Sequence, residues 1–587
     1  MPNSTDSRKF PWKAAVAFAG IAFPAAFIVL LILRYAMAIP MLDDWEMVPL
    51  VTKAHTGGLT FSDLFAQQQE ARTVFPKLIF IALSFGRYWD ARTAMMLSVL
   101  ICCLTALGLY RLLGRARLSE VTATTAFLLG VFLIFSPAQH ELWLLASGFP
   151  SFVPALCVVW GIFFATGQRR IGTRFLICAG LAVCASFTLS NGLLAWGLTF
   201  PVLFLTGAEQ PRKRWLLYWI LAAGACAALY FWDFHPMNDL PAFAPRKTIV
   251  EYWQYMAAFL GAAFGRAGNE HPVAISLGIG TALLVGYVVA LVDVVVRRRD
   301  LVHRARVVPW LALGGFSVGS SCLAALGRIE WGVAQALESR YVAFSIYLAI
   351  SVIALGAIYW TEFCAFSPGR RQRLAVFAAA MLVVTGCFTF MLLCAADSIS
   401  FFRVRSAAAR LGQTAVLFSP ALDTSQTTMA VNFPRPDFAR RNADALDRLR
   451  LLRTPLVRTC EIAKLRHAEV GTGGAAGWWD GLTIGNDGTN TAWGWAALPE
   501  TNRSADAVVL AYANERGEWI VFALSDAVLS RPDVARTLGS ADQLWSGWRA
   551  RFAATALPKG VEISAWAINA REPKLYRLKT AVPMLNP

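Results

Sequence analysis

The chain has 587 residues, of which 57% are hydrophobic and only 16% charged, and its mean hydropathy is +0.50. Because soluble globular chains carry about 25% charged residues, this composition excludes an ordinary soluble protein and favours one with several membrane-spanning helices. The net charge of +17 is concentrated in short loops between alternate apolar runs, which is typical of the cytoplasmic loops of membrane proteins and argues against nucleic acid as a partner.

Eleven apolar runs predict membrane-spanning helices. The first run is longer than the apolar part of a signal peptide, so we expect no cleavable signal. Clusters of arginine and lysine follow alternate runs, which predicts a cytoplasmic N-terminus and, because the number of runs is odd, an extracytoplasmic C-terminus. The predicted spans lie near residues 14–38, 93–113, 121–136, 149–168, 173–189, 193–207, 215–232, 273–296, 307–326, 341–361 and 374–396.

The first outer loop, predicted at 39–92, is long and rich in ionisable residues. It opens with Asp43 and Asp44, followed by Trp45 and Glu46. Carboxylates this close to a bilayer are costly unless they have a function. Two interpretations stay open for the pair: solvated acids that end a helix, or a general base beside an aromatic wall for a sugar. Later in the loop, the apolar segment 75–88 predicts a short half-inserted or interfacial helix.

Other charged residues lie in the outer loops. Glu70 and Arg72 form either a surface ion pair of little energy or a polar lip around a substrate phosphate. Arg340 stands beside Tyr341 at the start of a span, so it either extends its side chain to the interface or binds a lipid phosphate. The outer loop 233–272, rich in aromatic residues and proline, predicts an interfacial anchor. The other candidates are His140, Glu141 and Arg328, with a turn at Ser190-Asn191-Gly192.

The composition changes after the last predicted span. Residues 398–455 are arginine-rich, and we predict a linker over 398–470 that contains a helix from Asp437 to Leu452. From about Gly477, short apolar segments separated by Gly, Asn, Asp and Pro predict a β-sandwich-like domain over 471–587, whose tryptophans fit either sugar stacking or a packed core. Of the eleven cysteines, only Cys460 lies in this polar part, which excludes an internal disulfide there.

Taken in chain order, the outer motifs resemble those of the GT-C superfamily of glycosyltransferases, polytopic enzymes that use polyprenyl-phosphate-linked sugars. The motifs are Asp43-Asp44-Trp45, Glu70-Ala71-Arg72 with Phe75-Pro76-Lys77, Gln139-His140-Glu141 with Trp143, Ser190-Asn191-Gly192, and Ser339-Arg340-Tyr341. The resemblance covers residues 14–396, and this combination of motifs is similar to that of bacterial GT-C-like membrane proteins. More loosely, residues 530–534 resemble β-sandwich modules that accompany bacterial glycan-modifying proteins. The expected fold is an α-helical polytopic GT-C-like domain over 1–397 in the bacterial inner membrane, with an extracytoplasmic β-rich domain.

The resemblance implies transfer of a sugar from a polyprenyl-phosphate donor to an envelope glycan or lipid acceptor, with inversion. Asp43 or Asp44 would be the general base, and Arg340, with Arg72 or Arg328, would stabilise the leaving phosphate. No metal-ligand cluster is evident, so no metal site is predicted, and the cofactor question stays open with a divalent metal as one option. The remaining candidates for substrate binding are Trp45, Glu46, Glu70, His140, Glu141 and Tyr341.

Two other functions fit the same pattern. A non-catalytic transporter or flippase of lipid-linked glycans would tolerate replacement of Asp43 and Asp44 and would need a through-going cavity. The few charged residues within the predicted spans argue against a proton-coupled relay. An O-antigen-type polymerase or ligase would place its main polar pocket beside the late loop 327–341, far from Asp43.

Overall fold

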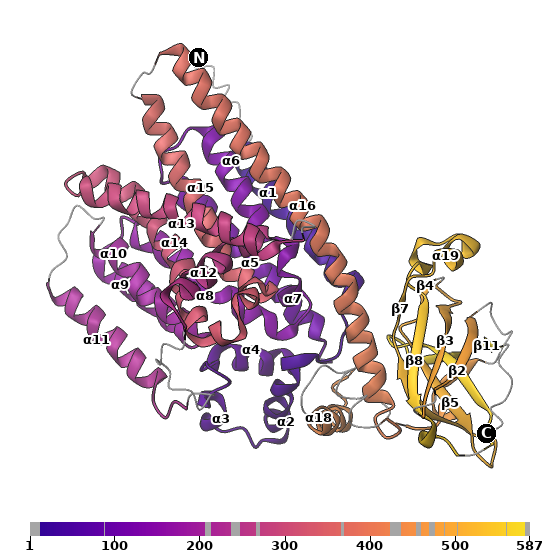
Figure 1. Cartoon of the computed structure of the whole chain (residues 1–587). Helices are drawn as coiled ribbons and strands as arrows, with labels where there is room; N and C mark the ends of the chain where they lie inside the picture. The colour runs from indigo at the N-terminus through magenta and orange to yellow at the C-terminus, as the bar shows by residue number, and fades with distance from the viewer. Residues whose placement is uncertain are drawn as a thin grey trace, which may run out of the picture.

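The structure is a computed structural model in which a large helical domain is joined to a smaller domain of β-strands (Figure 1). The residues it describes are 12–86, 88–205, 213–235, 247–265, 270–365, 369–422, 436–452, 459–468, 476–485, 488–501, 503–558 and 560–580.

Eight helical segments in the described ranges are long and apolar enough to cross a membrane, which indicates a multi-pass membrane protein. Each of them overlaps one predicted span. They are Ala15–Tyr35, Ala91–Leu113, Glu120–Trp143, Ala146–Ala165, Pro272–Val296, Leu301–Trp331, Ser339–Ala365 and Leu374–Leu417. The main helices within them are α1 (Trp12–Tyr35), α5 (Ala91–Leu113), α6 (Glu120–Ile134), α7 (His140–Trp143), α8 (Val153–Ala165), α13 (Pro272–Val296), α14 (Leu301–Arg328), α15 (Val342–Ala365) and α16 (Arg370–Leu417).

The other three predicted spans fall on helices that do not meet the same criteria. Helices α9 (Ile171–Ser186) and α10 (Leu194–Leu205) have 16 and 12 residues, short of the about 20 that a span needs. Helix α11 (Lys213–Tyr230) has 18 residues and begins with two charged ones. The predicted number of eleven membrane spans therefore stays a prediction.

The loop predicted at 233–272 contains a helix, α12 (Ile249–Gly261), whose second half is buried in the helical domain. It packs closely on α13 because glycines face each other: a Cβ on Gly261 would lie 1.9 Å from the carbonyl oxygen of Ser276, and one on Gly280 would lie 1.8 Å from that of Ala257. Small residues allow this close approach of helix backbones. The short helix predicted for 75–88 is present as α4 (Val74–Ser84), which has 11 residues and is too short to span a membrane.

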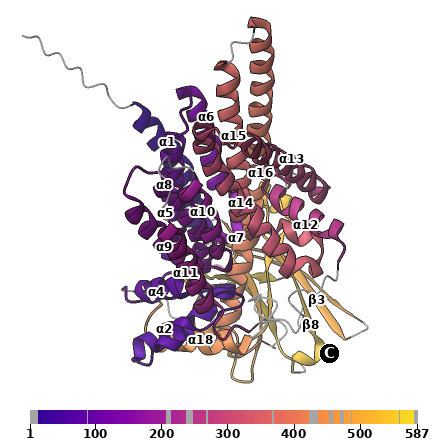
Figure 2. The ribbon, with the colours of Figure 1, turned by 90° about the vertical axis from the view of Figure 1, so that its left-hand side faces the viewer.

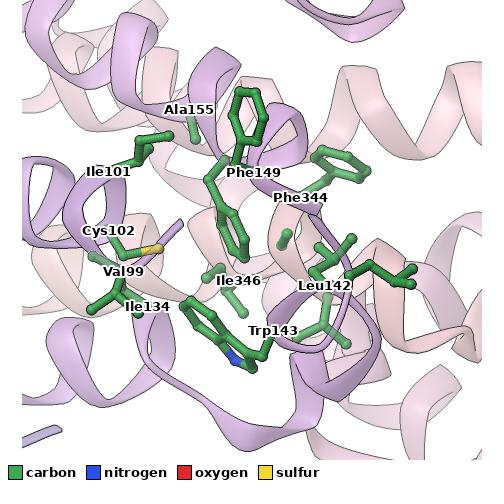
Figure 3. Packing of buried hydrophobic residues seen from close by; sticks show 14 of the residues in the cluster. Val99, Ile101, Cys102, Ile134, Leu142, Trp143, Phe149, Ala155, Phe344 and Ile346 are labelled. Atoms are coloured by element: carbon green, nitrogen blue, oxygen red, sulfur yellow. The ribbon is translucent and has the colours of Figure 1, made fainter. Parts of the chain in front are cut away.

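The two ends of the helical domain differ in charge. One end carries α2 (Val48–Thr56), α3 (Phe61–Phe65) and α4, which follow the short helix η1 (Leu42–Met47), and we call it the Asp43 end (Figures 1 and 2). At the opposite end lie the basic connections 114–119, 166–170 and 297–300, and we call it the arginine end. Between the ends, side chains of several helices form a packed core that includes Trp143, Phe149 and Phe344 (Figure 3).

Helix α16 links the two domains. It continues without a break past the predicted boundary at 397 and runs to Leu417, beside the strand domain (Figure 1). The predicted helix in the linker is confirmed as α18 (Pro436–Arg448), which buries Ala439, Ala443 and Leu446 on one face and lies at the Asp43 end. There, the backbone N–H of Trp89 donates to the carbonyl oxygen of Leu451 at 2.8 Å.

The C-terminal domain consists of two sheets with a shared apolar core, in agreement with the predicted sandwich. One sheet has the strand order β1-β10-β9-β5-β6, and the other β11-β2-β3-β8-β7 with β4 paired to β3. Trp479, Trp548 and Trp566 are buried, whereas Trp478 and Trp545 are exposed. The strands are β1 (Arg466–Ala468), β2 (Gly477–Ile484), β3 (Thr489–Leu498), β4 (Arg503–Ser504), β5 (Ala507–Ala513), β6 (Trp519–Ser525), β7 (Ala527–Leu529), β8 (Gly547–Ala553), β9 (Ile563–Asn569), β10 (Lys574–Arg577) and β11 (Lys579–Thr580).

The strand domain contacts the helical domain through ion pairs. On α16, Nη1 of Arg410 lies 3.1 Å from the buried carboxylate of Asp506, which also accepts the backbone N–H of Ala570 at 2.8 Å. Arg34, near the end of α1, pairs with Asp542 at 3.3 Å on the surface. The surface pair contributes little to docking, because solvent screens exposed charges.

Candidate functional site

A cavity of about 290 Å³ lies at the Asp43 end of the helical domain. This volume is at the lower end of the range for small-molecule pockets. Polar lining residues come from four separate outer connections, so the fold collects side chains that are far apart in sequence. They include Asp43, Gln68, Gln69, Glu70, Thr73, Glu141, Ser147, Ser151, Ser190, Asn191, Ser320, Arg328, Arg340 and Tyr341.

The two adjacent aspartates have different environments. Asp43 is exposed and lines the cavity, and within the described ranges its carboxylate makes no ion pair. Asp44 is fully buried and does not line the cavity. Neighbouring residues of a short 3₁₀-helix point about 120° apart, so one carboxylate faces the cavity while the other enters the protein.

Asp44 ties the first outer loop to the second. Its Oδ1 accepts the backbone N–H of Ser147 at 2.7 Å, and its Oδ2 accepts those of Met41 and Ala146 at 3.1 and 3.3 Å. These bonds hold η1 against η3 (Ala146–Phe152) and so fix the position of Asp43 at the cavity wall. Burial raises the pKa of Asp44 to about 6, although the three N–H donors and the Ser147 side chain act in the opposite direction.

We expect Asp44→Ala to destabilise the protein by several kcal/mol, because each buried N–H left without an acceptor costs about 1–3 kcal/mol. The adjacent exposed residue offers a matched control: Asp43→Ala is expected to change stability by no more than about 0.5 kcal/mol. Thermal unfolding of the purified protein in detergent measures both. Equal unfolding midpoints for the two variants would contradict the structural role of Asp44.

The pH dependence has a definite sign. In the unfolded chain an aspartate has a pKa of about 4. Between pH 4 and 6 the folded protein therefore binds a proton at Asp44 that the unfolded chain has released. The contribution of this proton to stability is complete below pH 4 and is lost as the pH rises through 6, by about 3 kcal/mol for two pKa units. The stability of the wild type relative to Asp44→Asn should therefore fall over this window; a difference independent of pH would show that the pKa of Asp44 is not raised.

Glu70 and Arg328 form an ion pair at the cavity wall. Nη2 of Arg328 lies 2.9 Å from Oε1 of Glu70, which joins the first outer loop to the end of α14. Arg72, predicted to form the same polar lip, is instead 4% exposed and does not line the cavity. Its guanidinium donates to the carbonyl oxygens of Tyr230 and Phe65 at 2.6 and 2.8 Å. The structure thus places Arg72 as a support beneath the loop rather than as a phosphate ligand.

Arg340 also lines the cavity and is held more loosely than Arg328. Its side chain is 42% exposed, and Nη1 is 4.0 Å from Oε1 of Glu141. Arg405 on α16 lies closer to the same carboxylate, at 3.2 Å. The neighbouring Ser339 accepts the backbone N–H of Glu141 at 3.2 Å and donates to the carbonyl oxygen of Ala138 at 2.7 Å. Because Arg340 and Arg405 share the single negative charge of Glu141, the group keeps a net positive charge that an anion in the cavity can compensate.

Two further predicted residues line the cavity in polar contacts. The hydroxyl of Tyr341 accepts a hydrogen bond from Gln335 at 3.0 Å. The amide of Asn191, from the predicted turn, donates to Ser320 at 3.2 Å. Together with Ser147, they give the cavity neutral hydrogen-bonding groups of the kind that recognise hydroxyl groups.

Besides Arg72, three predicted substrate-binding residues lie away from the cavity wall. Trp45 is 1% exposed and belongs to the apolar core, so it does not form the expected stacking wall. Glu46 accepts a hydrogen bond from Gln68 at 3.2 Å, which positions the loop. The ring of His140 is buried and stacks on Phe401 of α16, with centroids 5.0 Å apart. These residues support the site rather than contact its contents.

Some residues of the site have no clear signal in the sequence. Arg405 lies in a segment predicted as linker, and only the continuation of α16 brings it to Glu141. Ser147 and Ser151 carry no distinguishing motif, although both line the cavity. Among the described residues, no three His, Cys, Asp or Glu side chains are grouped as metal ligands.

Comparisons with known proteins do not identify the chain: no protein-family model matches it, and no curated protein does.

Proposed function

We propose that the protein is a membrane glycosyltransferase that moves a sugar from a polyprenyl-phosphate donor to an envelope glycan or lipid acceptor on the extracytoplasmic face. One observation carries this proposal: a single cavity contains the exposed carboxylate of Asp43, which has no ion pair among the described residues, together with the loosely paired Arg340. A base and a phosphate-binding cation are the two groups that displacement of a phosphate leaving group requires.

The proposed step needs no nucleotide. The carboxylate of Asp43 accepts the proton of an acceptor hydroxyl, whose oxygen attacks the anomeric carbon from the side opposite the phosphate. The bond between that carbon and the phosphate oxygen breaks, so the lipid phosphate leaves with the electron pair and the anomeric configuration inverts. Arg340, together with Arg328 in the same cavity, stabilises the charge that develops on the leaving oxygen.

The rim of the cavity is compatible with a lipid donor. Leu323 on α14 lines the cavity and is 44% exposed, within a segment long enough to span the membrane. An apolar side chain at the opening allows the prenyl chain to stay in the bilayer while its phosphate enters the polar interior.

Two features favour the proposed glycosyltransferase over the flippase and over the polymerase. Phe80, Leu142 and Phe344 line the cavity and also belong to the packed core, in which Figure 3 shows Leu142 and Phe344. This packing supports a closed site over a through-going path. A polymerase of the alternative type would separate the late loop from Asp43, whereas here both line one cavity.

Mass spectrometry of lipid carriers and envelope glycans in a deletion strain tests the proposal. We expect the strain to accumulate one polyprenyl-phosphate-linked sugar and to lose one glycan substituent, since the donor is made but not used. Unchanged carriers and glycans, under conditions in which the wild type expresses the protein, would contradict it.

A further inference from the structure

A second cavity, of about 750 Å³, lies at the arginine end of the helical domain, opposite the candidate active site. It is formed by the end of α5, the end of α8, the first turn of α9 and the first turns of α14. The α14 side chains recur at positions that share one face of the helix. The lining residues are Leu112, Gly114, Arg115, Ala116, Arg117, Ala165, Thr166, Gly167, Gln168, Arg174, Leu301, Val302, Ala305, Arg306, Pro309 and Trp310.

The cavity has a strongly positive wall. Four arginines line it, and none of its described lining residues is acidic. Arg115 donates to the Thr166 hydroxyl at 2.6 Å and to the carbonyl oxygen of Phe163, and its guanidinium lies 3.7 Å from the Phe163 ring centroid. These partners are neutral, so they fix the side chain without compensating its charge.

The loop that presents the arginines is itself held in place. Nε of Arg306 donates to the carbonyl oxygen of Ala116 at 3.1 Å, and Nη1 of the same residue lies 2.9 Å from Glu362. Between Arg115 and the next helix, Arg117 has φ = 52°, in the left-handed region that costs a residue other than glycine about 1 kcal/mol or more. The exposed Arg117 side chain makes no ion pair within the described ranges. The site is thus built in advance of any ligand.

The rim of the cavity is apolar on the α14 side. Leu301 and Val302 line it and are 52% and 61% exposed. They begin a segment long enough to span a membrane, so we infer that they lie near its surface. A cluster of arginines next to exposed apolar side chains fits a ligand that carries both a phosphate and a hydrocarbon chain.

We propose that this cavity binds the phosphate of an anionic membrane lipid headgroup, at the end of the protein opposite the transfer site. Guanidinium groups bind phosphate oxygens through paired N–H donors, and a phosphate monoester or diester supplies the negative charge that the wall lacks. Inorganic phosphate offers the same charge without a hydrocarbon chain. The experiment below therefore compares a lipid phosphate with free phosphate as the ligand. This inference does not depend on the proposed transfer reaction.

The test is native mass spectrometry of the full-length protein in detergent with dioleoylphosphatidic acid, dioleoylphosphatidylcholine or inorganic phosphate. We expect phosphatidic acid to bind more tightly than phosphatidylcholine, which has the same chains but no net charge. The double variant Arg115→Gln/Arg117→Asn should weaken phosphatidic acid binding at least about tenfold, as two phosphate-binding cations are lost. The control Arg111→Gln/Arg298→Gln removes the same charge from the arginine end outside the cavity and should stay within about twofold.

A second variant separates binding from folding. Arg117→Asn alone suits the left-handed backbone, since asparagine adopts it readily, and is expected to keep the wild-type unfolding temperature while binding phosphatidic acid more weakly. Weaker binding of inorganic phosphate than of phosphatidic acid identifies the lipid as the source; equal binding identifies free phosphate. Wild-type binding by Arg117→Asn and the double variant, or equal losses in the double variant and its control, would overturn the site.

Discussion

Replacing Asp43 by asparagine is expected to lower sugar transfer by about 10²- to 10⁴-fold, the range over which general bases contribute. The amide has the size of the carboxylate but cannot accept the proton of the acceptor hydroxyl. Because Asp43 is exposed and holds no other part of the chain through an ion pair in the described ranges, the variant should express and unfold like the wild type. Restoration of the missing glycan substituent in a deletion strain measures the activity.

Glu46→Gln is the matched control for this variant. It removes one carboxylate from the same short helix, η1, but its side chain does not line the cavity. We expect transfer within about threefold of the wild type, because it loses only part of a hydrogen bond to Gln68. If Asp43→Asn fully restored the glycan substituent, Asp43 could not be the general base. That result would favour a flippase of lipid-linked glycans, which needs no carboxylate at this position.

The second large effect is expected for Arg340→Ala, which should weaken binding of the donor lipid by about 10- to 100-fold. A hydrogen bond to a charged partner contributes about 1.5–3 kcal/mol, and each 1.4 kcal/mol corresponds to tenfold in affinity. The side chain lines the cavity and is only loosely paired with Glu141. Since Arg405 still neutralises that carboxylate, its charge is not left without a partner in the variant.

Binding of the polyprenyl-phosphate donor purified from the deletion strain measures this effect. Arg92→Ala serves as a control, because Arg92 pairs with Asp90 at 2.6 Å near the same end but does not line the cavity. An Arg340→Ala protein that folds and binds the donor as tightly as the Arg92→Ala protein would reject the phosphate role. Loss of transfer with unchanged donor binding would do the same and would assign Arg340 to the acceptor.

The sequence predicted the long spans better than the connections between them. A run of apolar residues has few stable alternatives to a helix in a membrane, so all eight long apolar helices overlap predicted spans. Helix α12 was predicted only as an interfacial anchor, although the capping box of Thr248 and Glu251 marks its first turn. Its burial follows from packing of Gly261 and Gly280, which depends on tertiary structure.

The predicted end of the membrane domain illustrates a second limit. The change from apolar to arginine-rich composition after Ala396 was interpreted as a domain boundary, yet α16 continues to Leu417. No glycine or proline lies between Gly386 and Gly412, so nothing local ends the helix. This continuation also places Arg405 beside Glu141, a contact between segments far apart in the chain.

For the site, the sequence indicated which loops meet but not which side chain of each loop faces the cavity. Asp43 and Asp44 are neighbouring residues of the same type, and they differ only in the direction in which the 3₁₀-helix points their side chains. Arg72 and Trp45 are buried because neighbouring carbonyl oxygens and apolar side chains surround them, which no local pattern reports. Arg340 and Tyr341 line the cavity because they begin a long span at the Asp43 end.

The most direct test of the proposed transfer is a single-turnover assay in proteoliposomes, with radiolabelled donor lipid and the acceptor identified from the deletion strain. The wild type should move the label from the lipid to the acceptor, while the Asp43→Asn protein should bind the donor and leave the label on it. Label that crosses the bilayer but stays on the lipid with wild-type protein, or equal transfer by wild type and Asp43→Asn, would contradict an enzyme that uses Asp43 as its base.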